Sequence, residues 1–171
     1  MKGYVQVYTG DGKGKTTAAI GLCVRAVGAG KRVLFVQFLK KGDFSEVKAL
    51  GCFGRMVHVK QFGSGRFVRG KPCKEDRELA AAGLRYVEER MGSGEYDVVV
   101  LDEINVAMNM GLVSVPQVLD LLADKPDNIE LVLTGRYAPT EIVDAADLVT
   151  ECRMVRHYFA RGVRARQGIE K

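Results

Sequence analysis

The chain reads Thr9-Gly10-Asp11-Gly12-Lys13-Gly14-Lys15-Thr16-Thr17 between an apolar run at residues 4–8 and another at residues 18–27. Three glycines let backbone N–H groups turn toward a bound phosphate, Lys15 supplies a cation for β- and γ-phosphate oxygens, and the Thr16 hydroxyl is a magnesium ligand. A helix that begins near Lys15 adds the positive end of its dipole to the same place. The stretch therefore predicts a polyphosphate site between a strand and a helix.

The usual form of this motif has a glycine where the chain has Thr9. A glycine-rich strand-to-helix turn that binds no ligand is the alternative interpretation. Such a turn does not need lysines at both 13 and 15, so we expect nucleotide binding. All nine residues of the loop are predicted to contact the nucleotide.

Six short apolar runs bounded by turn residues predict six strands, at residues 3–8, 32–38, 56–61, 97–101, 129–134 and 147–152. Helical patterns lie between them, at residues 15–28, at residues 74–91 and after Pro139, which suits a first helical position. Apolar runs such as residues 98–101 are continuous, as expected of parallel strands covered on both faces. We predict an α/β fold with three layers and a mostly parallel sheet, in one domain over residues 1–171 that ends in a basic segment, residues 153–171.

The composition narrows the possible functions. With 171 residues the chain can bury a core without metal or disulfide support, and its four cysteines form no C-x-x-C pair that would indicate a zinc site. It has no signal-peptide pattern and no apolar run of about 20 residues. We therefore expect a cytoplasmic protein without a membrane partner.

The formal charge of +5 belongs mainly to the end of the chain, because residues 151–171 hold six of the 26 basic but only two of the 21 acidic side chains. We interpret this as a solvated C-terminal segment. Contact with phosphates or another anionic ligand is the second interpretation, and duplex DNA is a distant third. The near-neutral body predicts no nucleic-acid partner.

Polar residues end the predicted strands, and ligands of open α/β sheets bind at that edge. Asp102-Glu103 follows four apolar residues, as in a Walker B strand whose acid holds magnesium directly or through water. Two adjacent carboxylates repel unless a cation lies between them and the phosphates. We predict Thr16, Asp102 and Glu103 as metal ligands. The other strand-end residues considered are Thr9, Gln37, Gln61, Thr134 and Arg136, of which Arg136 is a candidate phosphate contact.

Taken together, these motifs make the chain resemble the P-loop ATP:corrinoid adenosyltransferases, nearly from end to end. The blocks that carry the resemblance are the phosphate loop, Val36-Gln37-Phe38-Leu39-Lys40, Leu101-Asp102-Glu103-Ile104-Asn105, Leu133-Thr134-Gly135-Arg136, residues 146–151 and the closing residues 157–159 and 162–169. The resemblance implies a P-loop NTPase fold of the RecA-like type. It also implies transfer of the 5′-deoxyadenosyl group of ATP to the Co(I) of a reduced corrinoid, with release of triphosphate.

In that reaction cobalt is the nucleophile, so no general base is needed, and the protein must stabilise the departing triphosphate. The predicted catalytic residues are Lys15, Thr16 and Glu103. Beyond the loop itself, Gln37 and Arg136, at the ends of the second and fifth predicted strands, are predicted to contribute to ligand binding. Phe67, in the irregular stretch at residues 61–74, is the candidate for the face under the corrin, although it is equally suited to anchoring that loop to the core.

The family also implies Mg²⁺, an electron-donor protein such as a flavodoxin or flavin reductase, and a homodimer. A P-loop kinase or ATPase, in which Glu103 activates a hydroxyl or water for attack on the γ-phosphate, is the alternative enzyme. A thymidine kinase is disfavoured because it normally carries a zinc ribbon of paired cysteines. An ATP-dependent motor on single-stranded nucleic acid is a third interpretation, disfavoured by the absence of an exposed basic and aromatic run.

Overall fold

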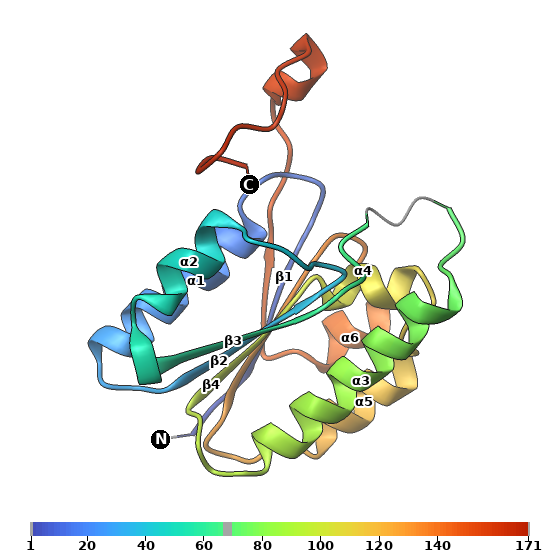
Figure 1. Cartoon of the computed structure of the whole chain (residues 1–171). Helices are drawn as coiled ribbons and strands as arrows, with labels where there is room; N and C mark the ends of the chain where they lie inside the picture. Colours follow the sequence, from blue (N-terminus) through green and yellow to red (C-terminus); the bar gives the residue numbers. More distant parts are fainter. Residues whose placement is uncertain (1, 67–69, 171) are drawn as a thin grey trace.

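The computed structural model describes residues 2–66 and 70–170, which form a parallel sheet between two layers of helices (Figure 1). The six strands pair in the order β3-β2-β4-β5-β1-β6, and every pair is parallel. This confirms the predicted α/β class and all six predicted strands. The strands are β1 Val5–Thr9, β2 Val33–Phe38, β3 Val57–Phe62, β4 Val98–Asp102, β5 Glu130–Thr134 and β6 Leu148–Glu151.

The helices differ more from the prediction. The helices at residues 15–28 and 74–91 are confirmed with those bounds, and Pro139 precedes its helix as the N-cap residue instead of occupying the first helical position. The sequence analysis did not predict α2, α4, α5 or either 3-10 turn. The helices are α1 Lys15–Gly28, α2 Ser45–Gly51, α3 Lys74–Met91, α4 Ile104–Asn109, α5 Val115–Ala123 and α6 Thr140–Ala145, with 3-10 turns η1 Gly54–Met56 and η2 Tyr158–Arg161.

Two apolar clusters hold the layers together. One lies between the sheet and the layer of α3, α4, α5 and α6, and the other lies between the sheet and the layer of α1 and α2. All six residues of β2 and all five of β4 are buried, which explains their unbroken apolar pattern. Helix α3 turns one apolar face to the sheet, since Ala80, Leu84, Val87 and Met91 recur at helical spacing and are all buried.

The register of the sheet decides which polar residues meet. Gln37 of β2 pairs with Gln61 of β3 on one side and with Asp102 of β4 on the other. Tyr8 of β1 pairs with Thr134 of β5. Because all the strands are parallel, their carboxyl ends lie at one edge of the sheet, and the phosphate loop leaves β1 at that edge. Strand β2 ends at Phe38 as predicted, whereas β3 continues one residue beyond its predicted end, to Phe62.

Candidate nucleotide and magnesium site

The phosphate loop joins β1 to α1 and folds around the ammonium group of Lys15. The Lys15 Nζ atom donates to the carbonyl oxygens of Gly10 at 2.8 Å and of Gly12 at 2.6 Å. Gly14, with a φ of 124°, is the N-cap of α1. Burial lowers the pKa of Lys15, and the charge of Arg136 lowers it further. A partly desolvated cation in a glycine-rich loop at a helix N-terminus suits a phosphate ligand.

The segment that follows β6 runs along this loop. The N–H of Gly12 donates to the Cys152 carbonyl at 2.6 Å, and the N–H of Cys152 donates to the Thr9 carbonyl at 2.8 Å. Asp11 Oδ1 accepts from the N–H of Met154 at 3.0 Å. Thr9, the residue that departs from the usual motif, uses its hydroxyl oxygen to accept a hydrogen bond from the N–H of Ala138. The loop is therefore held from both flanking segments.

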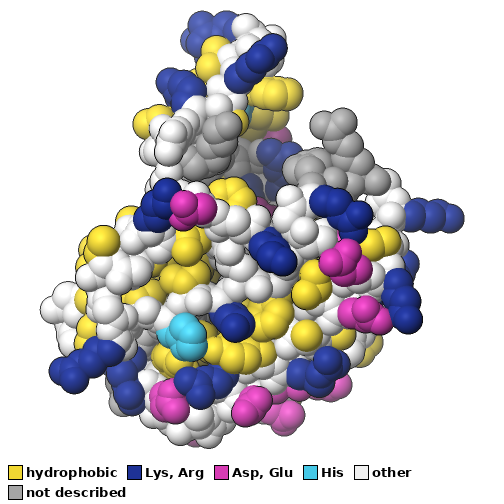
Figure 2. Space-filling view, viewed as in Figure 1, with side chains coloured by type: hydrophobic (Ala, Val, Ile, Leu, Met, Phe, Trp, Pro, Cys, Tyr) yellow, Lys and Arg dark blue, Asp and Glu magenta, His cyan; other side chains and the backbone are white. Residues whose placement is uncertain are grey.

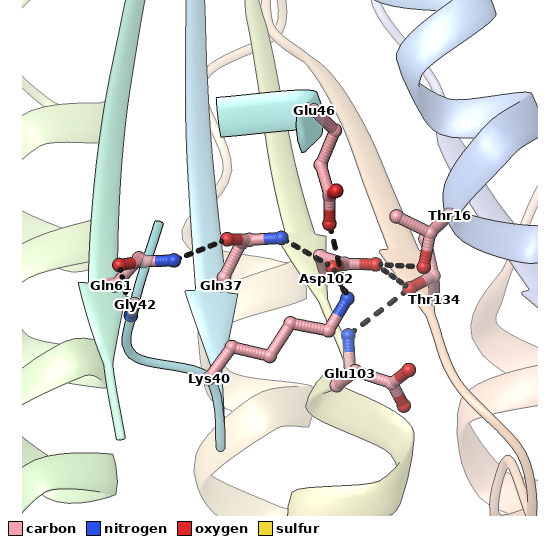
Figure 3. A network of polar contacts seen from close by, with 9 residues as sticks. All are labelled: Thr16, Gln37, Lys40, Gly42, Glu46, Gln61, Asp102, Glu103 and Thr134. Atoms are coloured by element: carbon pink, nitrogen blue, oxygen red, sulfur yellow. Dashed lines mark hydrogen bonds and ion pairs between the residues drawn. The ribbon is translucent and has the colours of Figure 1, made fainter. Parts of the chain in front are cut away.

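Asp102 lies at the centre of a polar network at the carboxyl edge of the sheet (Figure 3). Its side chain is fully buried and accepts four hydrogen bonds. Oδ1 accepts from the hydroxyls of Thr16 at 2.8 Å and Thr134 at 2.7 Å, whereas Oδ2 accepts from Lys40 Nζ at 2.8 Å and Gln37 Nε2 at 3.2 Å. A buried carboxylate with this many donors is held in one orientation.

Lys40 is the functional candidate that the sequence analysis missed. It follows Leu39, whose φ of 61° turns the chain sharply after β2, and its ammonium lies between Asp102 and Glu46, which is 4.0 Å away. Burial alone lowers the pKa of Lys40, but the Asp102 carboxylate outweighs this, so the pKa is raised overall. Lys40 is therefore charged. The signal was its place in the motif at residues 36–40, directly after a strand end.

Glu103 shares the strand end but not the network of Asp102. It has a left-handed φ of 65°, and its N–H donates to the Thr134 hydroxyl at 3.1 Å. In Figure 3 its carboxylate points away from that of Asp102. Burial raises the pKa of Glu103, and the negative charge of Asp102 raises it further. No described residue donates a hydrogen bond to its carboxylate. A partly desolvated, unpaired carboxylate beside a phosphate loop is suited to bind a cation.

Glutamine side chains continue the network across the sheet. Gln61 Nε2 donates to Gln37 Oε1 at 2.9 Å, and Gln61 Oε1 accepts from the N–H of Gly42 at 3.1 Å. Gln37 is fully buried, so this chain of amides fixes it with its NH₂ group toward Asp102. The structure therefore gives Gln37 a contact with the predicted acid and not a free surface for a ligand.

A family model described as ATP:corrinoid adenosyltransferase BtuR/CobO/CobP matches residues 1–170. The chain belongs to this family. Curated relatives agree. The chain is 32% identical to the corrinoid adenosyltransferase of Pseudomonas aeruginosa, covering 99% of this chain and 84% of that protein, and 33% identical to corrinoid adenosyltransferase CobA of Salmonella typhimurium, covering 99% and 86%. An uncharacterised Nostoc protein is 36% identical over 92% of the chain, which spans 45% of that protein's length.

Membership of the adenosyltransferase family supports ATP-dependent transfer of an adenosyl group to a corrinoid, and it does not favour a kinase or ATPase acting at the γ-phosphate. Among solved structures, a KaiC-like protein of Pyrococcus horikoshii has a TM-score of 0.57 at 20% identity, covering 88% of this chain and 73% of that one. That similarity shows the fold alone, and it confirms the predicted P-loop NTPase fold of the RecA-like type. None of the helices described here is sufficiently long and apolar to cross a bilayer.

The structure of this family member brings together most of the residues that the sequence singled out. Lys15, Thr16, Asp102, Gln37 and the strand-end Thr134 lie in one connected region. Lys13, Thr17 and Arg136 are exposed beside it, and the charge of Arg136 acts on Lys15 and Glu103. Phe67, the candidate for the corrin face, lies outside the described residues.

Proposed function

We propose that the chain holds ATP by its triphosphate in the loop at residues 9–17, and leaves the ribose C5′ open to attack by the Co(I) of a reduced corrinoid. The observation that supports this most is the cluster of Lys15, Thr16 and the acid pair Asp102-Glu103 at one edge of the sheet, in a chain of this family. The C5′–O bond breaks, a Co–C bond forms with the electron pair of Co(I), and triphosphate leaves with that oxygen.

The protein has to stabilise the leaving group and does not have to activate the nucleophile. Co(I) carries no proton, so no side chain has to act as a general base. Negative charge grows on the oxygen of the α-phosphate as the bond breaks. In this proposal Lys13, Lys15, Arg136 and the N–H groups of the loop stabilise that charge, and they need little rearrangement because the fold already holds the loop. Placing C5′ in line with cobalt supplies the remaining acceleration.

Thr16 and Glu103 are the residues we propose to hold Mg²⁺, and their hard oxygen ligands suit this ion. Magnesium neutralises charge on the phosphates when it is bound. Because Asp102 already accepts four hydrogen bonds, we assign it the role of orienting the Thr16 hydroxyl, which donates a hydrogen bond to Asp102 and keeps its lone pairs for the metal. Asp102 thus acts on the metal through its neighbours.

Lys40 completes the charge balance of the acid pair. It supplies one positive charge beside Asp102 before any metal or nucleotide is present. Without it, the carboxylates of Asp102 and Glu103 would face each other's charge inside a partly desolvated edge of the sheet. We therefore assign Lys40 a positioning role: it holds the Asp102 carboxylate through an ion pair and leaves Glu103 as the carboxylate that receives magnesium.

Three further parts of the proposal concern the surroundings. Reaching Co(I) needs a strong reductant, which we expect from an electron-donor protein such as a flavodoxin or flavin reductase. We expect the chain to act in the cytoplasm and as a homodimer. Phe67 remains the predicted aromatic residue under the corrin.

The test is an anaerobic incubation of the purified chain with ATP, magnesium and chemically reduced cob(I)alamin. We expect the visible absorption of a cobalt–carbon product to appear together with one equivalent of triphosphate. Formation of ADP without an adenosylated product would instead show attack at the γ-phosphate. A reaction without protein controls for direct chemistry between Co(I) and ATP.

A further inference from the structure

The first residues of the segment after β6 are hydrogen-bonded to the phosphate loop. Residues 152–154 hydrogen-bond to Thr9, Asp11 and Gly12, as described above. Beyond them the chain does not return to the helical layers. Figure 1 shows it rising past the carboxyl edge of the sheet, next to the phosphate loop. The segment is thus anchored at the nucleotide site and projects from it.

This projecting segment has order of its own. The Tyr158 hydroxyl donates to Glu170, and Arg166 donates to Glu170 from both its backbone N–H, at 2.8 Å, and its guanidinium, at 3.0 Å. The Arg166 guanidinium also lies 5.0 Å from the centre of the Tyr158 ring. His157 Nδ1 accepts from the N–H of Phe159 at the start of η2. These contacts close residues 157–170 into a loop.

The same segment presents both apolar and basic groups to the outside. Val155 is 92% exposed and Phe159 is 74% exposed, which is unusual for large apolar side chains. Four arginines of the segment are exposed and form no ion pair or hydrogen bond with any residue in the described ranges: Arg153, Arg156, Arg161 and Arg164. An ordered segment with exposed apolar side chains and arginines that lack an ion-pair partner is suited to a particular kind of ligand. Such a ligand has an apolar centre and hydrogen-bond acceptors around its rim.

We propose that residues 153–164 form one wall of the corrinoid site. Val155 and Phe159 contact the flat apolar macrocycle, while arginines of the same segment donate hydrogen bonds to the amide or carboxylate oxygens around its rim. This rests on the proposed function, since a corrinoid must approach the ribose of an ATP bound in the adjacent loop. Figure 2 shows the segment projecting from the body of the protein, with basic side chains along it.

A second copy of the chain is the competing occupant of this surface. In a symmetric dimer formed through this segment, the same patch of each copy meets its duplicate, so the interface would gather the unpaired arginines of both copies. Burying like charges against each other is costly, whereas a ligand with carbonyl and carboxylate oxygens pairs with them. The charge of the segment therefore favours the corrinoid.

The test compares Phe159→Ala and Arg161→Gln with matched substitutions far from the segment. Val24→Ala on α1 removes an apolar side chain that is 48% exposed, and Arg55→Gln in η1 removes an exposed guanidinium. For each protein we would measure the Kd for cob(II)alamin in the presence of MgATP by visible absorption, the Kd for ATP by calorimetry, the mass by light scattering and the thermal unfolding midpoint.

We expect Phe159→Ala and Arg161→Gln each to raise the corrinoid Kd by about tenfold, which is about 1.4 kcal/mol, with the ATP Kd, mass and unfolding midpoint unchanged. The two control variants should match the wild type throughout. Any of three results would contradict the proposal that residues 153–164 line the corrinoid site: an unchanged corrinoid Kd, an equal rise in the ATP Kd, or a fall from dimer to monomer mass. If the wild type itself binds no corrinoid and forms no product, the proposed function fails and the wall fails with it.

Discussion

The Thr16 hydroxyl donates a 2.8 Å hydrogen bond to Asp102 Oδ1, joining the first turn of α1 to the end of β4 across 86 positions of sequence. The same oxygen accepts from the Thr134 hydroxyl of β5 at 2.7 Å. Two strands of the sheet, β4 and β5, and its first helix therefore meet on one carboxylate oxygen. This arrangement fixes the direction of the Thr16 proton, and hence of the lone pairs that the proposed metal would use.

Replacing Thr16 tests that relationship. Thr16→Val keeps the volume but removes the hydroxyl, and we expect magnesium affinity in the presence of ATP to fall by about 10- to 100-fold. Thr16→Ser keeps the hydroxyl and should stay within a few fold of the wild type. Magnesium titrations of ATP binding by calorimetry measure this. Equal affinities for Thr16→Val and the wild type would remove Thr16 from the metal site.

Lys15→Ala should abolish turnover, with a loss of at least about 100-fold in the rate of adenosylation. The ammonium that lies against Gly10 and Gly12 is the most buried cation of the phosphate loop, so no neighbour replaces it. Product formation from ATP and cob(I)alamin is followed by visible absorption. Lys31→Ala, which removes a partly exposed lysine paired with Asp97, is the control and should turn over normally.

The sequence could predict the strands and the phosphate loop because their signals are local. Six apolar runs, a glycine-lysine loop and an acid pair each occupy a few consecutive residues. The same is true in principle of α5, which the sequence analysis did not predict although Ser114 and Gln117 form a capping box beside Pro116. In contrast, α2 and α4 have seven and six residues, too short to show a helical period.

The contacts of Lys40 and of the C-terminal segment could not be predicted in this way. Lys40 reaches Asp102 because β2 and β4 are neighbours in register, although 62 positions separate the two residues. The segment after β6 reaches the phosphate loop because β6 pairs with β1. Both contacts depend on the order of strands in the sheet, which no local pattern encodes.

Lys40→Met should raise the affinity of the nucleotide-free protein for Mg²⁺. The substitution removes the positive charge that lies beside Asp102 and near Glu103. An added Mg²⁺ ion is then no longer repelled by Lys40, and it is attracted by carboxylates whose charge is less neutralised. It should also destabilise the fold by about 1–3 kcal/mol, because Asp102 loses a charged donor. Equilibrium dialysis with magnesium and urea unfolding measure the two effects. Lys48→Met, in an exposed pair with Asp43, should change neither. Weaker magnesium binding by Lys40→Met would contradict the positioning role.

Glu103→Gln should stabilise the magnesium-free protein at neutral pH. The pKa of Glu103 is raised in the folded protein, chiefly by burial, so its ionised form is disfavoured there relative to the unfolded chain. For an acid with a raised pKa this cost is absent below the unfolded value of about 4.3, and it grows as the pH rises toward the folded value. The unfolding midpoint of Glu103→Gln should therefore exceed that of the wild type at pH 7–8 and match it near pH 4. Glu78→Gln, an exposed control on α3, should show no such trend.

Gly12→Ala tests the contact between the phosphate loop and the segment that follows β6. A Cβ atom at position 12 would lie 2.6 Å from the Cys152 carbonyl oxygen and 2.8 Å from the Arg153 carbonyl carbon, both of them backbone atoms that cannot rotate away. The loop or the segment must then shift, at a cost of about 1–3 kcal/mol. Because the Gly12 carbonyl also accepts from Lys15, the shift should raise the ATP Kd as well. Gly21→Ala is the matched control: its Cβ would meet nothing within 4 Å, and a helix interior gains about 0.5–1 kcal/mol from alanine. Urea unfolding should therefore show that Gly12→Ala is less stable and Gly21→Ala more stable than the wild type. Calorimetry should show a raised ATP Kd for Gly12→Ala alone. Wild-type ATP binding by Gly12→Ala would show that the close contact has no bearing on the nucleotide site.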